Sequence, residues 1–89
     1  MKNDMNKIID GIWLGNVRAA SNLSALKSKG ITHILQALGG MEPCFPGQFK
    51  YCVLQVMDVP WENLGAHFMK AVMFIKGALA QGGTVFVHW

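Results

Sequence analysis

The side chains that could do chemistry in this sequence are two cysteines, three histidines and a few carboxylates. Cys44 falls in a predicted loop and Cys52 in a predicted strand, and neither precedes a glycine-rich loop that ends in arginine. Neither has a second cysteine or a histidine at zinc-finger spacing. We therefore predict two reduced thiols, one in a loop and one in the core, and we expect no metal and no cofactor.

Two other polar residues stand at the ends of predicted strands. Asp58 follows one strand-like segment and precedes a Val-Pro pair, and His88 is the last residue of another. Taken alone, they would be an ordinary loop carboxylate and an ordinary strand histidine. His33 and His67 are too far apart in the sequence, and too differently placed, to suggest a metal pair. The residues alone therefore leave the chemistry open.

Turn residues, caps and apolar patterns divide the chain into alternating strands and helices. Ser21 can accept a hydrogen bond from the first turn of a helix, and Asn63 can do so for a longer helix whose apolar residues recur at helical spacing. The expected elements are a strand or hairpin around Asp10-Gly11, a helix over 22–29, a strand over 31–38, a strand over 51–56, a helix from Asn63 that stops before Gly82-Gly83, and a strand over 84–88.

Several large side chains are interpreted structurally. Met57, Met69 and Met73 flank apolar runs and are predicted to fill the core. Trp13 and Trp61 are predicted to have a surface or packing role rather than to stack on a substrate.

Strands that alternate with helices favour an α/β fold with parallel pairing, because right-handed crossovers place the helices on the faces of the sheet. Ligands then bind beyond the carboxyl ends of the strands, so the last strand leads to the expected site. A chain of 89 residues has room for one domain. We expect an N-terminal tail over residues 1–7 and a single incomplete domain over residues 8–89.

Composition excludes several classes of protein. Hydrophobic residues make up 52% of the chain and charged residues 15%, which favours a folded protein over a disordered one. No apolar run approaches the roughly 20 residues needed to cross a bilayer, and no secretory signal is visible, so we expect a cytoplasmic protein that is also compatible with the nucleus. Eight Lys and Arg residues are spread along the chain without clustering, so neither nucleic acid nor membrane is an expected partner.

The order of the segments is similar to that of one protein family. A Leu-Gly-Asn turn, a Gly-Ile-Thr-His-Ile-Leu strand, an aspartate after the next strand, Asn63-Leu64 at the start of the long helix and a final Val-His pair follow one another at specific spacings. From about Ile8 to His88, the chain resembles the dual-specificity branch of the cysteine-based protein phosphatases. The resemblance implies a three-layer αβα domain with a mostly parallel central sheet, and the dephosphorylation of phosphoproteins.

In that family, the Val-His pair continues into a loop of the form HCxxGxxR. A cysteine thiolate attacks phosphorus, backbone amides and the arginine hold the phosphate oxygens, and an aspartate on a separate loop protonates the leaving oxygen. By position, His88 matches the motif histidine and Asp58 matches the general acid, whereas Trp89 stands where the nucleophilic cysteine belongs. The one arginine, Arg18, matches the turn before the first helix and cannot be carried over as the phosphate ligand.

The departure at Trp89 decides the functional prediction, because an indole carbon offers phosphorus no nucleophilic lone pair. We predict the front part of a dual-specificity phosphatase domain that lacks the phosphate-binding loop and the C-terminal helices and is inactive as written. A second hypothesis is a pseudophosphatase that binds a kinase or a phosphoprotein, and a third is a longer protein that continues past Trp89. Without further helices, strands 31–38 and 84–88 are expected to expose apolar side chains, which predicts a sticky, partly folded chain.

Overall fold

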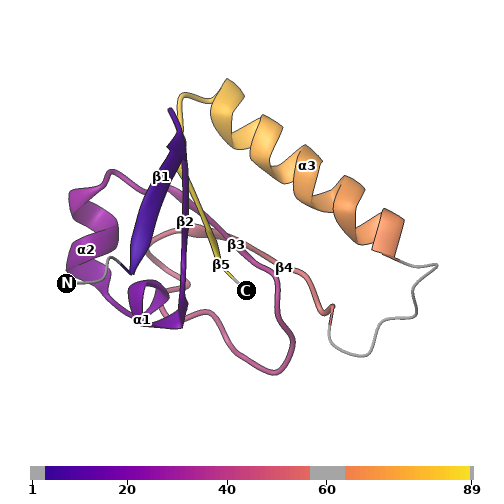
Figure 1. The fold of residues 1–89 in the computed structure, drawn as a ribbon, viewed down its shortest axis with the longest axis horizontal. Coiled ribbons are helices and arrows are strands. Elements are labelled where there is room, and N and C mark those ends of the chain that lie inside the picture. Colours follow the sequence, from indigo (N-terminus) through magenta and orange to yellow (C-terminus); the bar gives the residue numbers. More distant parts are fainter. Residues whose placement is uncertain (1–3, 57–63, 89) are drawn as a thin grey trace.

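The structure, a computed structural model, describes residues 4–56 and 64–88. Helices lie on both sides of a single sheet of five strands (Figure 1), which confirms the predicted α/β class and its layers. The elements are β1 (Met5–Ile9), β2 (Ile12–Gly15), α1 (Val17–Ala20), α2 (Leu23–Ser28), β3 (His33–Gln36), β4 (Lys50–Val53), α3 (Leu64–Ala80) and β5 (Val85–His88).

The first two strands form the predicted hairpin. β1 pairs with β2 in antiparallel fashion, and the turn between them contains Gly11 at a φ of 90°. β1 begins at Met5, within the seven residues expected to form a tail, and the division into tail and domain stays a prediction. Gly15 ends β2 at a position with no room for a side chain, because a Cβ atom there would lie 2.7 Å from the Phe86 ring.

The other pairings are parallel, in the sheet order β1-β2-β5-β3-β4. β5 therefore runs between β2 and β3, with His88 level with Gly15 on one side and with Gln36 on the other. The carboxyl ends of these strands meet at one edge, as expected from the alternation of elements. β3 and β4 are each four residues long: β3 occupies the middle of its predicted range, whereas β4 begins at Lys50, one residue before its predicted range, and ends at Val53.

The helix predicted over 22–29 is present as α2, but its cap differs from the prediction. Asn22 Oδ1 accepts a hydrogen bond from the Ala25 amide at 3.1 Å. Ser21 Oγ instead donates to the Val17 carbonyl at 2.8 Å. The assignment of the cap to Ser21 is wrong because Ser21 closes α1, a short helix that the sequence pattern did not predict.

Buried apolar side chains divide into two clusters, one on each face of the sheet. The α2-side cluster consists of Met5, Ala19, Ala20, Leu26, Ile31, Ile34, Phe49 and Phe86. The α3-side cluster consists of Leu35, Cys52, Leu54, Ala78 and Val85. Successive residues of β3 and β5 alternate between the clusters, because neighbouring side chains on a strand point to opposite faces.

Strands β3 and β5 are well buried, contrary to expectation. Ile34, Leu35, Val85 and Phe86 are each at most 3% exposed. The prediction that strands 31–38 and 84–88 expose apolar side chains is therefore wrong for these residues. They are covered because β5 lies in the middle of the sheet and β3 beside it, with helices on both faces.

The long helix α3 exposes what the sequence predicted to be core. α3 packs on β3 and β5, yet Met69 and Met73 are 57% and 67% exposed, so their assignment as core residues is wrong. Phe68, one of the apolar residues that recur at helical spacing in this helix, is also 67% exposed. Ala71, on the same turns of α3, packs against the α3-side cluster, so these exposed residues lie on a different side of the helix. Met57, Trp61 and the predicted cap Asn63 lie outside the described residues.

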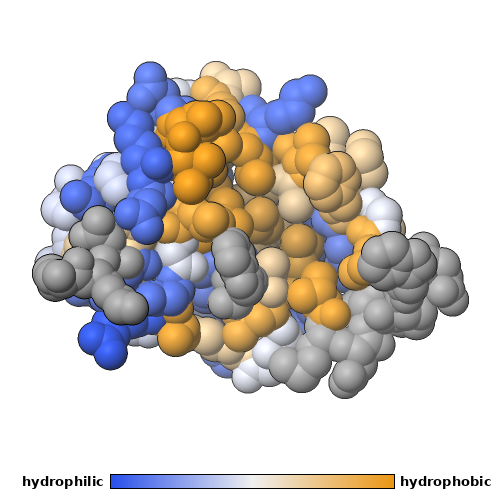
Figure 2. Space-filling view, in the orientation of Figure 1, coloured by the Kyte–Doolittle hydropathy of each residue, from blue (hydrophilic) through white to orange (hydrophobic). Residues whose placement is uncertain are grey.

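The space-filling view shows where hydrophobic residues lie on one face of the molecule. Hydrophobic atoms cover the centre of the face seen in Figure 2, between the β1–β2 hairpin and α3.

Trp13 packs against the α2-side cluster, with Lys29 Nζ 5.1 Å from its ring centroid, which confirms its packing role. Over residues 4–56 and 64–88, no helix has the length and apolar character needed to cross a bilayer.

Candidate active site at the carboxyl edge of the sheet

His88 is the predicted site residue that the structure places at the carboxyl edge. The ring lies on the α2-side face, stacked on Phe86 with 5.6 Å between ring centroids, and the residue has no exposed surface. Its carbonyl accepts a hydrogen bond from the Ala37 amide at 2.9 Å, so β5 stays paired with the β3 side up to its last described residue. Stacking and pairing together fix the position of the imidazole.

Gln36 determines which nitrogen of His88 carries the proton. Gln36 Nε2 donates to the Met41 carbonyl at 2.7 Å, which leaves Gln36 Oε1 as an acceptor. Oε1 lies 3.3 Å from His88 Nε2, so this nitrogen donates and carries the hydrogen. Gln36 is 1% exposed, and its orientation is therefore held by burial as well as by both hydrogen bonds.

The second ring nitrogen of His88 has no partner among the described residues, although it is fully buried. Burial lowers the pKa of His88 below its ordinary value, because the charged imidazolium loses hydration. The ring is therefore neutral at pH 7, with a proton on Nε2 and a lone pair on Nδ1. Such a group can accept a hydrogen bond from the backbone or from a side chain that follows β5.

Two predicted site residues, Asp58 and Trp89, lie outside the described residues, so the structure does not place them. Arg18 lies in α1 and is exposed, on a helix that precedes β3 in the chain. Nothing in the structure assigns it to the site at the carboxyl edge.

The two cysteines have the predicted environments. Cys52 is buried in the α3-side cluster, where burial raises the pKa of its thiol and keeps it protonated. Cys44 is exposed in the loop between β3 and β4, with its Sγ 3.7 Å from Ser21 Oγ. Cys52 faces the side of the sheet away from the His88 ring, so its thiol is not arranged with that ring as a nucleophile.

His33 lies at the opposite edge of the sheet from His88. Its Cα pairs with Val85, at the start of β5, and its Nδ1 is 2.7 Å from Thr32 Oγ1. The structure therefore does not bring these two histidines together. Within the described part of the chain, no group of three His, Cys, Asp or Glu side chains could hold a metal ion.

Sequence reasoning missed Gln36. It was predicted only as part of a buried strand, and its partner lies 52 positions further along the chain. The available signal was a lone amide in the apolar run ITHILQAL, because a buried polar side chain requires a hydrogen-bond partner. The identity of that partner depends on the register of β3 against β5.

Known proteins resemble this chain in both sequence and structure. No protein-family model matches it. Dual specificity protein phosphatase 1 of Arabidopsis thaliana is 44% identical over 81 residues, which are 91% of this chain and 41% of that protein. Dual specificity protein phosphatase 22-A of Danio rerio is 38% identical over 88 residues, which are 99% of this chain and 42% of that protein. The chain thus spans less than half of the length of these two relatives.

Solved structures give the same result. The human tyrosine phosphatase-like serine/threonine/tyrosine-interacting protein matches with a TM-score of 0.82 and 36% identity, over 94% of this chain and 60% of the other. DUSP15 matches with a TM-score of 0.82 and 31% identity, over 94% of this chain and 53% of the other. Both comparisons therefore align more than nine-tenths of this chain with one set of relatives.

Proposed function

Because this chain belongs to the dual-specificity protein phosphatase family, we propose that it is the front part of a catalytic domain that removes phosphate from phosphoproteins. The observation that carries the proposal is His88, which is neutral, buried and held by Gln36 at the edge where parallel strands position active sites. The chain supplies the sheet and this histidine. We place the domain over residues 8–89, and its location in the cytoplasm remains part of the proposal.

The proposed chemistry assigns a role to each matched position. A thiolate following the motif histidine forms a bond to phosphorus as the bond from phosphorus to the substrate oxygen breaks, and Asp58 gives its proton to that oxygen. His88 holds the start of the loop through its free Nδ1. Trp89 occupies the position of the thiolate in this sequence, and it cannot form the bond to phosphorus.

We therefore expect no phosphoester hydrolysis by the 89-residue polypeptide. The test is release of p-nitrophenol from p-nitrophenyl phosphate by the purified chain, compared with a variant that carries both Cys44→Ser and Cys52→Ser. Equal, background rates are the expected result. Turnover by the original chain above this variant would show that one of its own thiols acts as the nucleophile, and the proposal of inactivity would be wrong.

The roles of Asp58 and His88 are tested in a chain that carries the full loop. Residues 1–88 are joined to the part of the Arabidopsis relative that begins at the corresponding cysteine. We expect this fusion to hydrolyse p-nitrophenyl phosphate, and Asp58→Asn to lower kcat by about 10²–10⁴-fold and to remove the basic limb of the pH profile. A matched change at another carboxylate, Asp10→Asn, should leave kcat unchanged. An Asp58→Asn fusion that keeps full activity would exclude the assignment of the general acid.

A second function is supported by the name of one protein that matches in both sequence and structure. The human protein with the similar structure is described as tyrosine phosphatase-like and as a serine/threonine/tyrosine-interacting protein. By analogy, this chain could act as a pseudophosphatase that binds a kinase or another phosphoprotein. The test is titration of a fluorescent phosphotyrosine peptide against the purified chain, with the same peptide without phosphate as control. Indistinguishable binding of the two peptides would exclude recognition of the phosphate group.

A further inference from the structure

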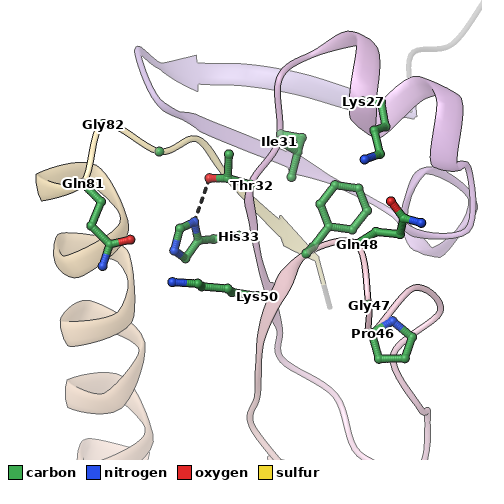
Figure 3. Close-up of a pocket in the computed structure, with 12 residues that line it drawn as sticks. Lys27, Ile31, Thr32, His33, Pro46, Gly47, Gln48, Lys50, Gln81 and Gly82 are labelled. Carbon is green, nitrogen blue, oxygen red and sulfur yellow. Dashed lines mark hydrogen bonds between the residues drawn. The ribbon is translucent and has the colours of Figure 1, made fainter.

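An open pocket lies at the amino edge of the parallel strands (Figure 3), and His88 lies at the opposite, carboxyl edge. It has a volume of about 690 Å³ and lies between the carboxyl end of α3 and the segment that leads into β4. The lining includes residues from α2, β3 and β4 as well as the Gly82-Gly83 turn after α3. None of these residues belongs to the site described above.

The charged side chains around this pocket are positive. Lys27 and Lys50 line it together with His33, and no Asp or Glu is among the lining residues. Among the described residues, neither lysine forms a salt bridge. The field of Lys50 also reaches His33, because Lys50 adds to the effect of burial in lowering the pKa of that histidine. An anionic ligand would therefore meet uncompensated positive charge.

The polar groups are distributed on two sides of the opening. Figure 3 shows Lys27 and Gln48 on one side and Lys50 and Gln81 on the other, with Ile31 between them in this view. Lys27 Nζ lies 5.7 Å from the centroid of the Phe49 ring, which also lines the pocket. Each side thus offers one ammonium group for a carboxylate and one amide for a peptide backbone.

We propose that this pocket binds an acidic peptide segment of a partner protein, with one carboxylate at Lys27, a second at Lys50 and an apolar side chain between them. An extended ligand fits better than a single small anion, because the two ammonium groups are on different sides of the opening. The pocket lies at the opposite edge from His88, so this binding does not depend on the phosphatase chemistry.

The test is the fluorescence anisotropy of a labelled peptide, Glu-Glu-Leu-Glu-Glu, titrated with the 89-residue chain. We expect saturable binding, and we expect Lys27→Glu and Lys50→Glu each to raise Kd by about tenfold or more through repulsion of the carboxylates. The matched control is Lys76→Glu, an exposed lysine of α3 that does not line the pocket, which should change Kd by less than about threefold. Equal weakening by all three variants would show general attraction to the net charge and would overturn the proposal.

Further measurements separate loss of binding from loss of folding. The far-ultraviolet circular dichroism of each variant is recorded, and the neutral variants Lys27→Gln and Lys50→Gln are titrated wherever a charge reversal lowers the helical signal. A peptide that binds the folded form should also raise the melting temperature of the original chain. Absence of binding to the original chain, equal binding of Lys-Lys-Leu-Lys-Lys, or displacement of the peptide by an equal concentration of inorganic phosphate would each overturn the proposal.

Discussion

The two faces of the sheet are covered to different degrees. On one face, α1 and α2 close over the α2-side cluster, in which Leu26, Ile34 and Phe86 have no exposed surface. On the other face, α3 is the only described helix, and Ala78 is its one fully buried residue. Figure 1 shows this difference as two short helices close to the hairpin and one long helix set at an angle on the other side.

This difference indicates which part of the chain contributes most to its stability. Burial of apolar surface is the main favourable contribution to folding, so the α2-side cluster should supply most of it. The exposed apolar residues of α3 instead form a surface that favours association with other molecules. One face therefore holds the fold together, and the other face is available for contacts.

The largest expected effect comes from removing the aromatic ring at the centre of the α2-side cluster. Phe86→Ala should lower the free energy of unfolding by about 3–5 kcal/mol, because it leaves a cavity beneath β5 and also removes the ring on which His88 stacks. A loss of this size is comparable to the whole stability of a small domain, so the cooperative urea transition should disappear.

The matched control is the same substitution on the other face. Phe68 is 67% exposed on α3, so Phe68→Ala should change the free energy of unfolding by less than about 0.5 kcal/mol. Urea denaturation followed by circular dichroism measures both variants. Similar losses for the two phenylalanines would mean that the faces contribute equally, and the comparison between them would fail.

The sequence predicted the described strands and helices except α1, but not how well each is covered. β-branched runs placed β3 and β5 correctly, because buried parallel strands are rich in such residues. The apolar spacing of α3 also predicted a helix correctly. Met69 and Met73 were wrongly assigned to the core because they flank apolar runs, and a position beside an apolar run does not say which side of the helix a residue occupies.

The candidate site was predictable only in part, for a related reason. His88 could be assigned from the final Val-His pair and its position on the last strand. Gln36 could not be assigned as its partner, because the contact depends on the pairing of β3 with β5. The helix cap was assigned to Ser21 instead of Asn22 for the same reason. Both residue types can cap a helix, and only the start of α2 distinguishes them.

A smaller effect on stability is expected from the titration of two histidines, His88 on the α2 side of the sheet and His33 on the α3 side. Burial lowers the pKa of both His33 and His88, with a further contribution from Lys50 at His33, below the ordinary histidine value of 6.5. Below about pH 6.5 the unfolded chain therefore binds more protons than the folded chain, and stability should fall as the pH decreases through this range. Above that range both states hold neutral imidazoles, and this contribution to stability is fully present.

Urea denaturation at several pH values between about 7.5 and about 5.5 measures this dependence. His88→Gln keeps an amide donor near Gln36 and removes the titrating group on the α2 side. His33→Asn keeps a hydrogen-bonding side chain near Thr32 and removes the titrating group on the α3 side. We expect His88→Gln to flatten the pH dependence more, because His88 has no exposed surface whereas His33 is 7% exposed. A flatter profile for His33→Asn than for His88→Gln would reverse this assignment.

The smallest effect on stability, and the most direct test of the open face, comes from exposed residues of α3. A double variant with Met69→Ser and Met73→Ser should change the free energy of unfolding by about 0.5 kcal/mol or less, because both side chains are more than half exposed. It should also shift the chain toward monomer in sedimentation velocity, since it removes apolar surface from the helix. The matched control changes Ile8 and Ile9 of β1, which are 54% and 57% exposed, to Ser. If association follows the isoleucines and not the methionines, the sticky surface belongs to the hairpin, and α3 is not the face on which contacts form.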